Sequence, residues 1–442
     1  MDGLERIRMQ DLIEKVNEQC ENSYEGCVQL LSRLIACRSL SGQEAECAEV
    51  LVSFFNNRNI PCFVDARGSV LAVSLPRHTS GEPPADMAAQ GAAWLRAELE
   101  KARESGFKIL AFNAHIDVVG ADNPEEWRDE PFKAVRKFGR IFGRGTCDMK
   151  GALAAMAMAI SLSRELDRNF DRNCVLLGCF CTEEEVAEGL AFKELLEEFA
   201  IRPDMVLLGE PSKMQIARGQ RGKLEMLVET AGVCAHTSVP EAGSNAAYKL
   251  ARALLAIENF DAEERFKHGL EPESILQRTT MVASTIESWP KSKSFVPNRA
   301  RTHVTARLAL GENLQTVGRR LIADENWPDA NITPIVYKGA SYKGKESEWK
   351  AEHPAWETST DHPFFHQLAN AFKELFDAEP VDKIWPFSTD GVYSAGMAGI
   401  PTLGIGPGHE EVAHKNDEWV SEEELKNALK LYALLGFFKA EP

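Results

Sequence analysis

The pattern of apolar and polar positions along the chain changes twice. Before about residue 216, nearly continuous apolar runs alternate with segments in which apolar residues recur at helical spacing. The runs 109–114, 173–181 and 205–208 predict buried strands, and the segments 44–57, 149–162 and 190–199 predict helices. Strands alternating with helices indicate an α/β fold, with a parallel or mixed sheet covered by helices on both faces.

The pattern after residue 216 is typical of a different kind of domain. Segments 223–230 and 301–310 alternate as half-exposed strands do, and helices are expected over 245–257 and 314–322. After Tyr342 the first pattern returns, with helices over 366–376 and 422–438 and a strand over 402–405. We therefore predict a catalytic domain in two parts, residues 1–216 and 341–442, with a small α+β domain inserted at 217–340.

Two segments of the first part stand apart from the alternation. Apolar positions between residues 5 and 35 predict two helices before Ser39. Segment 78–105 combines a Pro/Gly loop at 78–84 with an Ala-rich amphipathic helix at 88–103, and we interpret it as an insertion that decorates the surface.

Composition narrows the class of protein. A chain of 442 residues exceeds what one hydrophobic core usually covers, which agrees with two domains. The net charge of −17 argues against nucleic acid or an anionic membrane as partner, and no apolar run reaches the length of a membrane span. The first 15 residues are charged throughout and do not form a secretory signal, so we expect a cytoplasmic protein. The ten cysteines all precede residue 235 without paired zinc-ribbon spacing, which favours buried thiols.

Candidate metal ligands follow the ends of the predicted strands. Asp148 lies in a Gly-rich turn that enters a helix; alone, it is more typical of a helix cap. Its companions at or near strand ends change that interpretation: they are His115, Glu185, Glu210 and, in a late loop, His414. Imidazole and carboxylate together suit zinc, and also cobalt or manganese. A bridging Asp148 with two further ligands on each side would hold two ions about 3.5 Å apart.

Other acidic residues suggest supporting roles. Asp117, two residues after His115, is placed to accept the other N–H of that imidazole and so to fix its orientation. The run Glu183–Glu185 has a simple explanation, because helix N-termini favour acids. In a metal site, Glu185 can instead ligate while Glu184 acts as general base, and Glu183 receives no role.

The motifs in fixed order resemble one family. Asn113–Asp117, Gly145–Gly151, Thr182–Glu185, Gly209–Ser212 and the late His414 look like the dinuclear zinc family of acetylornithine deacetylase, succinyl-diaminopimelate desuccinylase, aminoacylase and the glutamate carboxypeptidases. The resemblance covers nearly the whole chain. Segments 218–222 and 387–392 further resemble its branch of selenium-metabolism-linked hydrolases.

The resemblance implies a role for each matching residue. Asp148 bridges two metal ions, His115 and Glu210 complete one set of ligands, Glu185 and His414 complete the other, and Glu184 is the base. The peptide bond after the bridging Asp is often cis in this family. The inserted domain corresponds to a dimerisation lid, whose His236 reaches the partner's site and steadies the oxyanion.

The lid also carries a substrate-binding match and a departure. Arg307 matches an arginine that binds a substrate carboxylate, a task suited to its bidentate fork. Where relatives have an asparagine two residues before Ile-Pro, this chain has Ser294, and Asn298 is the candidate to replace that substrate contact.

We therefore predict a dinuclear-metal amidohydrolase that acts as a homodimer on a small N-acyl or N-carbamoyl amino acid or a dipeptide. A non-catalytic relative with a binding or assembly role, and a peptidase acting on longer chains, are the alternatives. His353, His362 and His366 could form a metal cluster on spacing alone, but a loop entering a helix is the simpler explanation. His409 is a weaker candidate for substrate contact. The Gly404-x-Gly-x-Gly408 pattern does not predict a nucleotide-binding loop, because Pro407 interrupts it and no helix follows.

Overall fold

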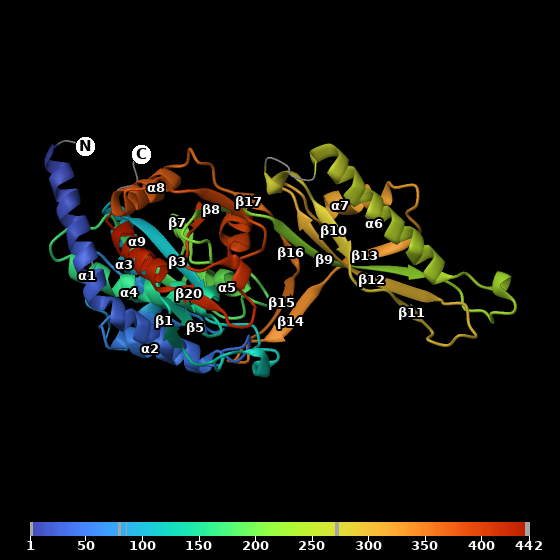
Figure 1. The fold of residues 1–442 in the computed structure, drawn as a ribbon, viewed down its shortest axis with the longest axis horizontal. Helices are drawn as coiled ribbons and strands as arrows, with labels where there is room; N and C mark the ends of the chain where they lie inside the picture. Colours follow the sequence, from blue (N-terminus) through green and yellow to red (C-terminus); the bar gives the residue numbers. More distant parts are fainter. Residues whose placement is uncertain (1–2, 78–80, 85, 270–273, 438–442) are drawn as a thin grey trace.

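The structure, a computed structural model, describes residues 3–77, 81–84, 86–269 and 274–437. Figure 1 shows a large α/β body that contains both ends of the described chain, and a smaller elongated lid that extends from one side. The predicted fold class, an α/β protein with a second, smaller α+β part, is confirmed.

A nine-stranded mixed sheet forms the centre of the large body. β6 pairs with β3 in parallel and with β2 in antiparallel orientation, so the predicted buried strand lies in the middle of a mixed sheet. β7 continues the parallel set beside β3, and β19 lies parallel to β7. The order is β1 (Cys62–Val64), β2 (Val70–Ser74), β6 (Cys174–Cys181), β3 (Lys108–His115), β7 (Met205–Leu208), β19 (Thr402–Gly404), β8 (Ile216–Gln220) and β17 (Trp356–Glu357), with β18 (Asp382–Trp385) also on β8.

Helices cover both faces of this sheet because its strands are apolar on both faces. Along β6, Leu176 and Phe180 pack into one core cluster, whereas the alternate residues Leu177 and Cys179 pack into another. The first cluster is closed by α1 (Gly3–Ala36), α2 (Ala45–Asn56), α4 (Gly151–Leu166), α8 (Pro363–Phe376) and α9 (Glu422–Leu435). The second is closed by α3 (Met87–Glu104) and α5 (Leu190–Phe199).

The lid is a six-stranded antiparallel sheet with helices on one face. The order β10 (Thr280–Ala283), β12 (Arg299–Leu308), β9 (Gly222–Ala231), β13 (Ala330–Pro334) is extended by β11 (Glu287–Trp289) on β12 and β16 (Glu352–His353) on β9. β9 and β12 alternate between buried and half-exposed residues, as their sequences predicted. Their buried residues pack against α6 (Ala246–His268) and α7 (Leu314–Ile322).

Strand pairing suggests slightly different domain limits from those predicted. β8, up to Gln220, belongs to the large sheet, and β16, up to His353, belongs to the lid sheet. We therefore propose that the chain crosses between domains near Arg221 and Pro354. A hairpin of β14 (Val336–Ala340) and β15 (Glu346–Lys350) lies just before the second crossing, and a small sheet of β4 (Val135–Lys137), β5 (Arg140–Phe142) and β20 (Trp419–Ser421) flanks the large body.

Three local predictions need correction or a limit. Residues 5–35 form one continuous helix, not two, because nothing in the segment interrupts the burial of its apolar stripe from Leu12 to Ile35. The helix of segment 78–105 is not a surface decoration: Leu95, Leu99 and Ala102 of α3 are buried in the second core cluster. Residues 78–80, 85 and 438, which fall in predicted elements, lie outside the described residues.

No helix within the described part of the chain has the length and apolar character needed to cross a membrane.

Candidate metal site

The carboxyl ends of four strands bring the predicted ligands together. His115 is the last residue of β3, and its Cα pairs with that of Cys181 at the end of β6, so the segment 182–185 begins beside it. Glu210 follows β7 by two residues, and the loop after β19 carries His414. β3, β6, β7 and β19 run in the same direction, so these segments meet at one edge of the sheet, where sites of α/β proteins form.

Asp148 lies between two histidines and divides the ligands into two groups. Its Oδ1 is 3.0 Å from Nε2 of His115, and its Oδ2 is 3.1 Å from Nε2 of His414. Glu210 stands on the first side, 4.0 Å from His115 Nε2, and Glu185 on the second, 3.1 Å from His414 Nε2. The family resemblance predicts the same two ligand sets, and which ion each residue would hold stays a prediction.

A buried carboxylate from a distant segment fixes the loop that carries Asp148. Glu418 accepts hydrogen bonds from the backbone N–H groups of Gly145, Cys147 and Asp148 at 2.8–3.0 Å, and from the guanidinium of Arg144 at 2.7 Å. Gly145 has φ +84°, and a Cβ there would stand 2.6 Å from the Val118 side chain, so the turn requires glycine. The Asp148–Met149 peptide bond is cis, as the resemblance implies.

Asp117 supports the site through both its backbone carbonyl and its carboxylate. The Nδ1 atom of His115 lies 2.9 Å from the backbone carbonyl oxygen of Asp117 but 3.6 Å from its carboxylate, so the carbonyl accepts the imidazole hydrogen bond. The carboxylate of Asp117 instead accepts from the backbone N–H groups of Glu184 and Glu185, each at 3.1 Å, and from the hydroxyl of Ser41 at 2.7 Å. Asp117 therefore positions both the histidine and the glutamate segment.

The three successive glutamates point to different surroundings. Glu183 is buried against Arg67, and it accepts a hydrogen bond from Tyr337 at 2.9 Å, so its side chain serves the packing of this region. Glu184 and Glu185 both line a cavity of about 350 Å³ with Asp148, Glu210 and His414. Ligand atoms of Glu184, Glu210 and His115 lie within 4.8 Å of one another, as do those of Glu185, Asp148 and His115.

Two of the described lid residues line this cavity. Arg307 lines it, together with Lys223, Ser388 and Glu188. His236 and Asn298 are exposed and lie in another part of the lid, where the backbone of His236 pairs with that of Phe295 and Gly232 N–H donates to the Asn298 carbonyl. The structure thus places Arg307 at the cavity of the candidate ligands in its own chain, and His236 and Asn298 elsewhere on the lid.

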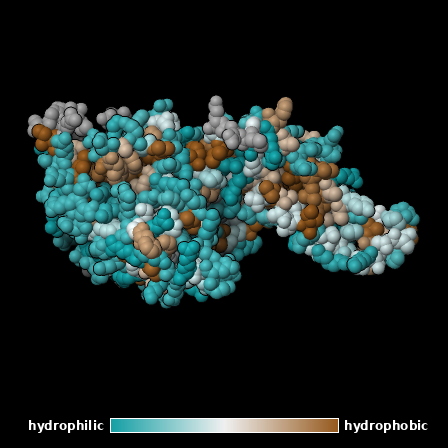
Figure 2. Space-filling model, in the orientation of Figure 1, coloured by the Kyte–Doolittle hydropathy of each residue, from teal (hydrophilic) through white to brown (hydrophobic). Residues whose placement is uncertain are grey.

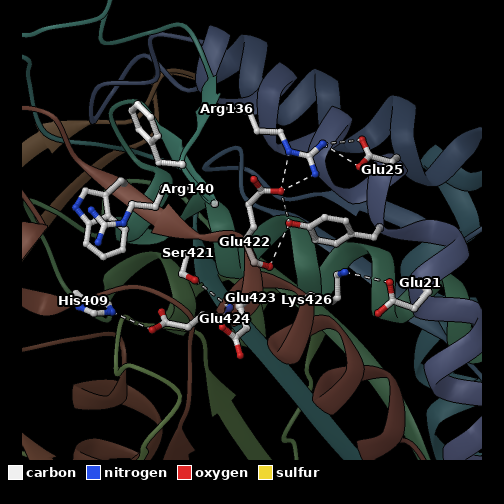
Figure 3. A pocket seen from close by; sticks show the side chains of 14 residues that line it. Glu21, Glu25, Arg136, Arg140, His409, Ser421, Glu422, Glu423, Glu424 and Lys426 are labelled. Atoms are coloured by element: carbon white, nitrogen blue, oxygen red, sulfur yellow. Dashed lines mark hydrogen bonds and ion pairs between the residues drawn. The ribbon is translucent and has the colours of Figure 1, made fainter.

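Among the described residues, His353, His362 and His366 do not gather at one metal site. His362 caps α8 by accepting from the Phe364 N–H, and His353 is buried between Glu188 and Ser388. His409 lines a separate surface hollow of about 810 Å³ between α1, β5 and α9. Figure 3 shows its ring directed at Glu424, with Nε2 2.9 Å from that carboxylate. His409 lines this separate hollow and is not among the residues that line the cavity of the candidate ligands, so its position does not support a substrate contact there.

Comparisons with known proteins agree with this arrangement. Residues 111–436 match the model of peptidase family M20/M25/M40. The Escherichia coli (strain K12) protein YgeY is 30% identical over 332 residues, which cover 75% of this chain and 80% of that protein. The chain belongs to peptidase family M20/M25/M40.

Other members of this family are similar over most of their length. A probable succinyl-diaminopimelate desuccinylase of Staphylococcus epidermidis is 24% identical over 363 residues, 76% of this chain and 85% of the relative. The solved structure of Bacillus subtilis YXEP, a dinuclear metal-binding peptidase of the M20 family, has a TM-score of 0.64 and 14% identity, and covers 94% of this chain and 98% of that one. This M20 protein is therefore a metal-dependent hydrolase of C–N bonds, and the selenium-linked branch stays a prediction.

Burial and hydrogen bonds shift the pKa values of the candidate ligands and of Glu184. Burial alone would lower the pKa of His115, but its interactions with the carboxylates of Asp117 and Asp148 outweigh burial and raise that pKa well above its usual value. Hydrogen bonds with Asp148 and Glu185 raise the pKa of His414 to about 10. Burial raises the pKa of Glu184 and Glu210 well above the ordinary range. The raised pKa values favour the protonated forms of these groups, whereas metal binding requires the unprotonated forms.

Metal loading should consequently release protons. At pH 7 both imidazoles carry a proton that they must lose to ligate, so we expect release of about two protons per chain, or more, and tighter metal binding as pH rises toward 10. Calorimetric titration with Zn²⁺ in buffers of different ionisation enthalpy measures this number. The variant His414→Ala should release fewer protons, and a binding enthalpy independent of the buffer would contradict the protonated state.

Several residues that build the site were not predicted. Glu418 follows His414 by four residues, but no spacing rule connects a carboxylate in that loop with the backbone of 145–148. Glu44, which accepts from the backbone N–H of Gly42 and of Glu183, is a second buried example. The contacts of Glu418 with 145–148 and of Glu44 with Glu183 join segments far apart along the chain, and the sequence carries no local signal for them.

Proposed function

We propose that this M20 protein is a dinuclear-metal amidohydrolase that cleaves the amide bond of a small N-acyl or N-carbamoyl amino acid or a dipeptide. The observation that carries the proposal is the position of Asp148, with one oxygen toward His115 and the other toward His414. A single carboxylate so placed suits a ligand shared by two ions.

The donor set fits two divalent cations. His115 and Glu210 would hold one ion, Glu185 and His414 the other, and Asp148 both; zinc is the best match to these donors, with cobalt or manganese as alternatives. Four carboxylates converge here, and repulsion from Asp148 adds to burial in raising the pKa of Glu210, which indicates a site built to contain further positive charge. When bound, such ions would polarise the scissile carbonyl and lower the pKa of a water molecule.

Residues of this chain supply the remaining steps. Glu184 lines the cavity beside the ligands, and it would accept a proton from the attacking water and deliver it to the departing amine nitrogen. Burial and a raised pKa make its carboxylate a stronger base than an exposed glutamate. Arg307, which also lines the cavity, would bind the substrate carboxylate through its guanidinium fork.

His236 and Asn298 lead us to propose a homodimer formed through the lid. Both are exposed, and neither lines the cavity of its own chain, so we expect a second copy to receive their contacts. Apolar surface is visible on the lid in Figure 2, and Leu255, Val282 and Ile286 are among its exposed large apolar residues. His236 would donate to the developing oxyanion in the partner's cavity.

The cavity favours small substrates over long peptides. A volume of about 350 Å³ is at the lower end of small-molecule sites, and Arg307 closes one side with a charge suited to a terminal carboxylate. A non-catalytic role is disfavoured because every position assigned to a ligand or to the base retains a suitable side chain.

The test combines metal analysis with a substrate panel. We expect elemental analysis of the reconstituted protein to find two ions per chain, and the Zn- or Co-loaded protein to hydrolyse at least one N-acetyl, N-succinyl, N-carbamoyl or dipeptide substrate. A chelator should abolish this turnover, and added metal should restore it. One ion or none at saturation would refute the dinuclear site, and loaded protein inactive on the whole panel would refute the proposed reaction.

A further inference from the structure

Three basic side chains stand in one row across the lid strands that face the cavity. In the strand register, Arg307 of β12 lies opposite Lys223 of β9, and Lys223 lies opposite His353 of β16. Residues directly opposite across antiparallel strands point to the same face, where like charges repel unless opposite charges compensate them. Each basic residue of this row can therefore be examined for a carboxylate partner, and one without such a partner is a candidate to bind an anionic ligand.

Arg307 is the uncompensated member of the row. Other basic residues on the same face of β12 have carboxylate partners: Arg299 has Glu229, Arg301 has Glu287 and His303 has Glu225. Among the described residues no carboxylate lies within 4.0 Å of Arg307, and its Nη1 is buried without a hydrogen-bond partner. One anionic group is thus missing at this wall of the cavity.

Lys223 is compensated twice. Its Nζ lies 2.9 Å from Glu188 and 3.2 Å from Glu225, so two carboxylates share one ammonium. The second contact of Glu188 is Nδ1 of His353 at 3.4 Å, and burial lowers the pKa of His353, which leaves that imidazole neutral at pH 7. Glu188 lines the cavity and therefore presents negative charge that its own neighbours only partly neutralise.

The wall consequently offers an unpaired cation and a surplus carboxylate beside each other. A free α-amino acid carries the complementary pair, a carboxylate and an ammonium on one carbon. We propose that Arg307 and Glu188, spaced by Lys223, bind the α-carboxylate and α-ammonium of an amino acid whose acyl group is on a more distant nitrogen. The inference rests on the proposed amide hydrolysis and narrows its substrate class to N-acylated diamino acids with a free α-amino group.

Matched substrate pairs test this subsite. Each pair contains a diamino acid acylated on its side-chain nitrogen and the same compound with hydrogen in place of the α-ammonium, at the chain lengths of diaminobutyrate, ornithine and lysine. The acyl group is the one that the panel identifies, or acetyl if none does. One charge-assisted contact predicts that kcat/KM favours the ammonium-bearing member by about 10- to 100-fold for at least one length.

Variants locate the preference. Glu188→Gln should reduce it to within about threefold because the amide retains shape but not charge, whereas Glu188→Asp should keep its direction. Glu229→Gln, which removes a carboxylate from the same face of β9 but at the Arg299 pair, is the matched control and should not change the preference. Equal kcat/KM within every pair, or a preference unaltered in Glu188→Gln, would overturn the proposal.

Binding separates this proposal from the proposed reaction. Calorimetry compares each free diamino acid with its des-amino analogue on metal-loaded protein, and it does not depend on turnover. Tighter binding of the diamino acid, lost in Glu188→Gln, supports the subsite even if no amide is hydrolysed, in which case the proposed reaction alone fails. Equal binding of both ligands by a protein that hydrolyses amides refutes the subsite alone.

Discussion

Replacing Glu184 with glutamine should lower kcat by about 10²–10⁴ while the fold and the two bound ions are retained. The amide has nearly the same volume, so it fits the buried position beside His115 and Glu210, but it cannot accept a proton from water at neutral pH. Purified variant and native protein should be compared by steady-state kinetics, elemental analysis and circular dichroism.

The neighbouring residue supplies the control for this experiment. Glu185→Gln should lose both activity and affinity for one ion. The Glu185 carboxylate lies 3.1 Å from Nε2 of His414, and the same imidazole nitrogen lies 3.1 Å from Asp148. Glu184 also lies close to candidate ligands, so its position alone does not distinguish a general base from a metal ligand. The metal content of each variant makes that distinction. Near-full turnover in Glu184→Gln, or loss of an ion there and not in Glu185→Gln, would exchange the two assignments.

Mixing two inactive variants, His236→Ala and Glu184→Gln, should restore activity. If each lid serves the partner's cavity, a heterodimer collects both defects in one site and leaves the other site intact. Random exchange of equal amounts makes about half of the dimers mixed, and one of the two sites in each is intact, so about a quarter of native activity should return. Activity measured against time after mixing, with exchange followed by labelled subunits, tests this.

The opposite outcome has an equally definite reading. If His236 served its own chain, every site in the mixture would lack either the histidine or the base, and activity would stay at the level of the separate variants. No recovery despite verified exchange would therefore exclude the shared site. Ser238→Ala is a useful companion, because Ser238 holds Nδ1 of His236 at 2.7 Å, and it should weaken the restoration without removing the imidazole.

The sequence by itself determined the α/β class and the identity of the candidate ligands. Each ligand follows a strand or a turn whose apolar pattern is local, and the parallel direction of β3, β6, β7 and β19 then makes their ends coincide. The apolar stripe of β9 and β12 likewise predicted the lid sheet with one covered face.

Only the tertiary structure decided which distant groups hold these residues in place. Glu418 on the backbone of Asp148 and Glu188 between Lys223 and His353 are contacts between segments far apart along the chain. The register that sets Arg307 opposite Lys223 results from the pairing of β12 with β9, two strands that lie far apart along the chain. Similarly, α3 reads as surface from its own sequence, but it is buried because the sheet offers an apolar face beside it. Local periodicity records which side of an element is apolar, whereas the partner that covers that side is set by packing of the whole fold.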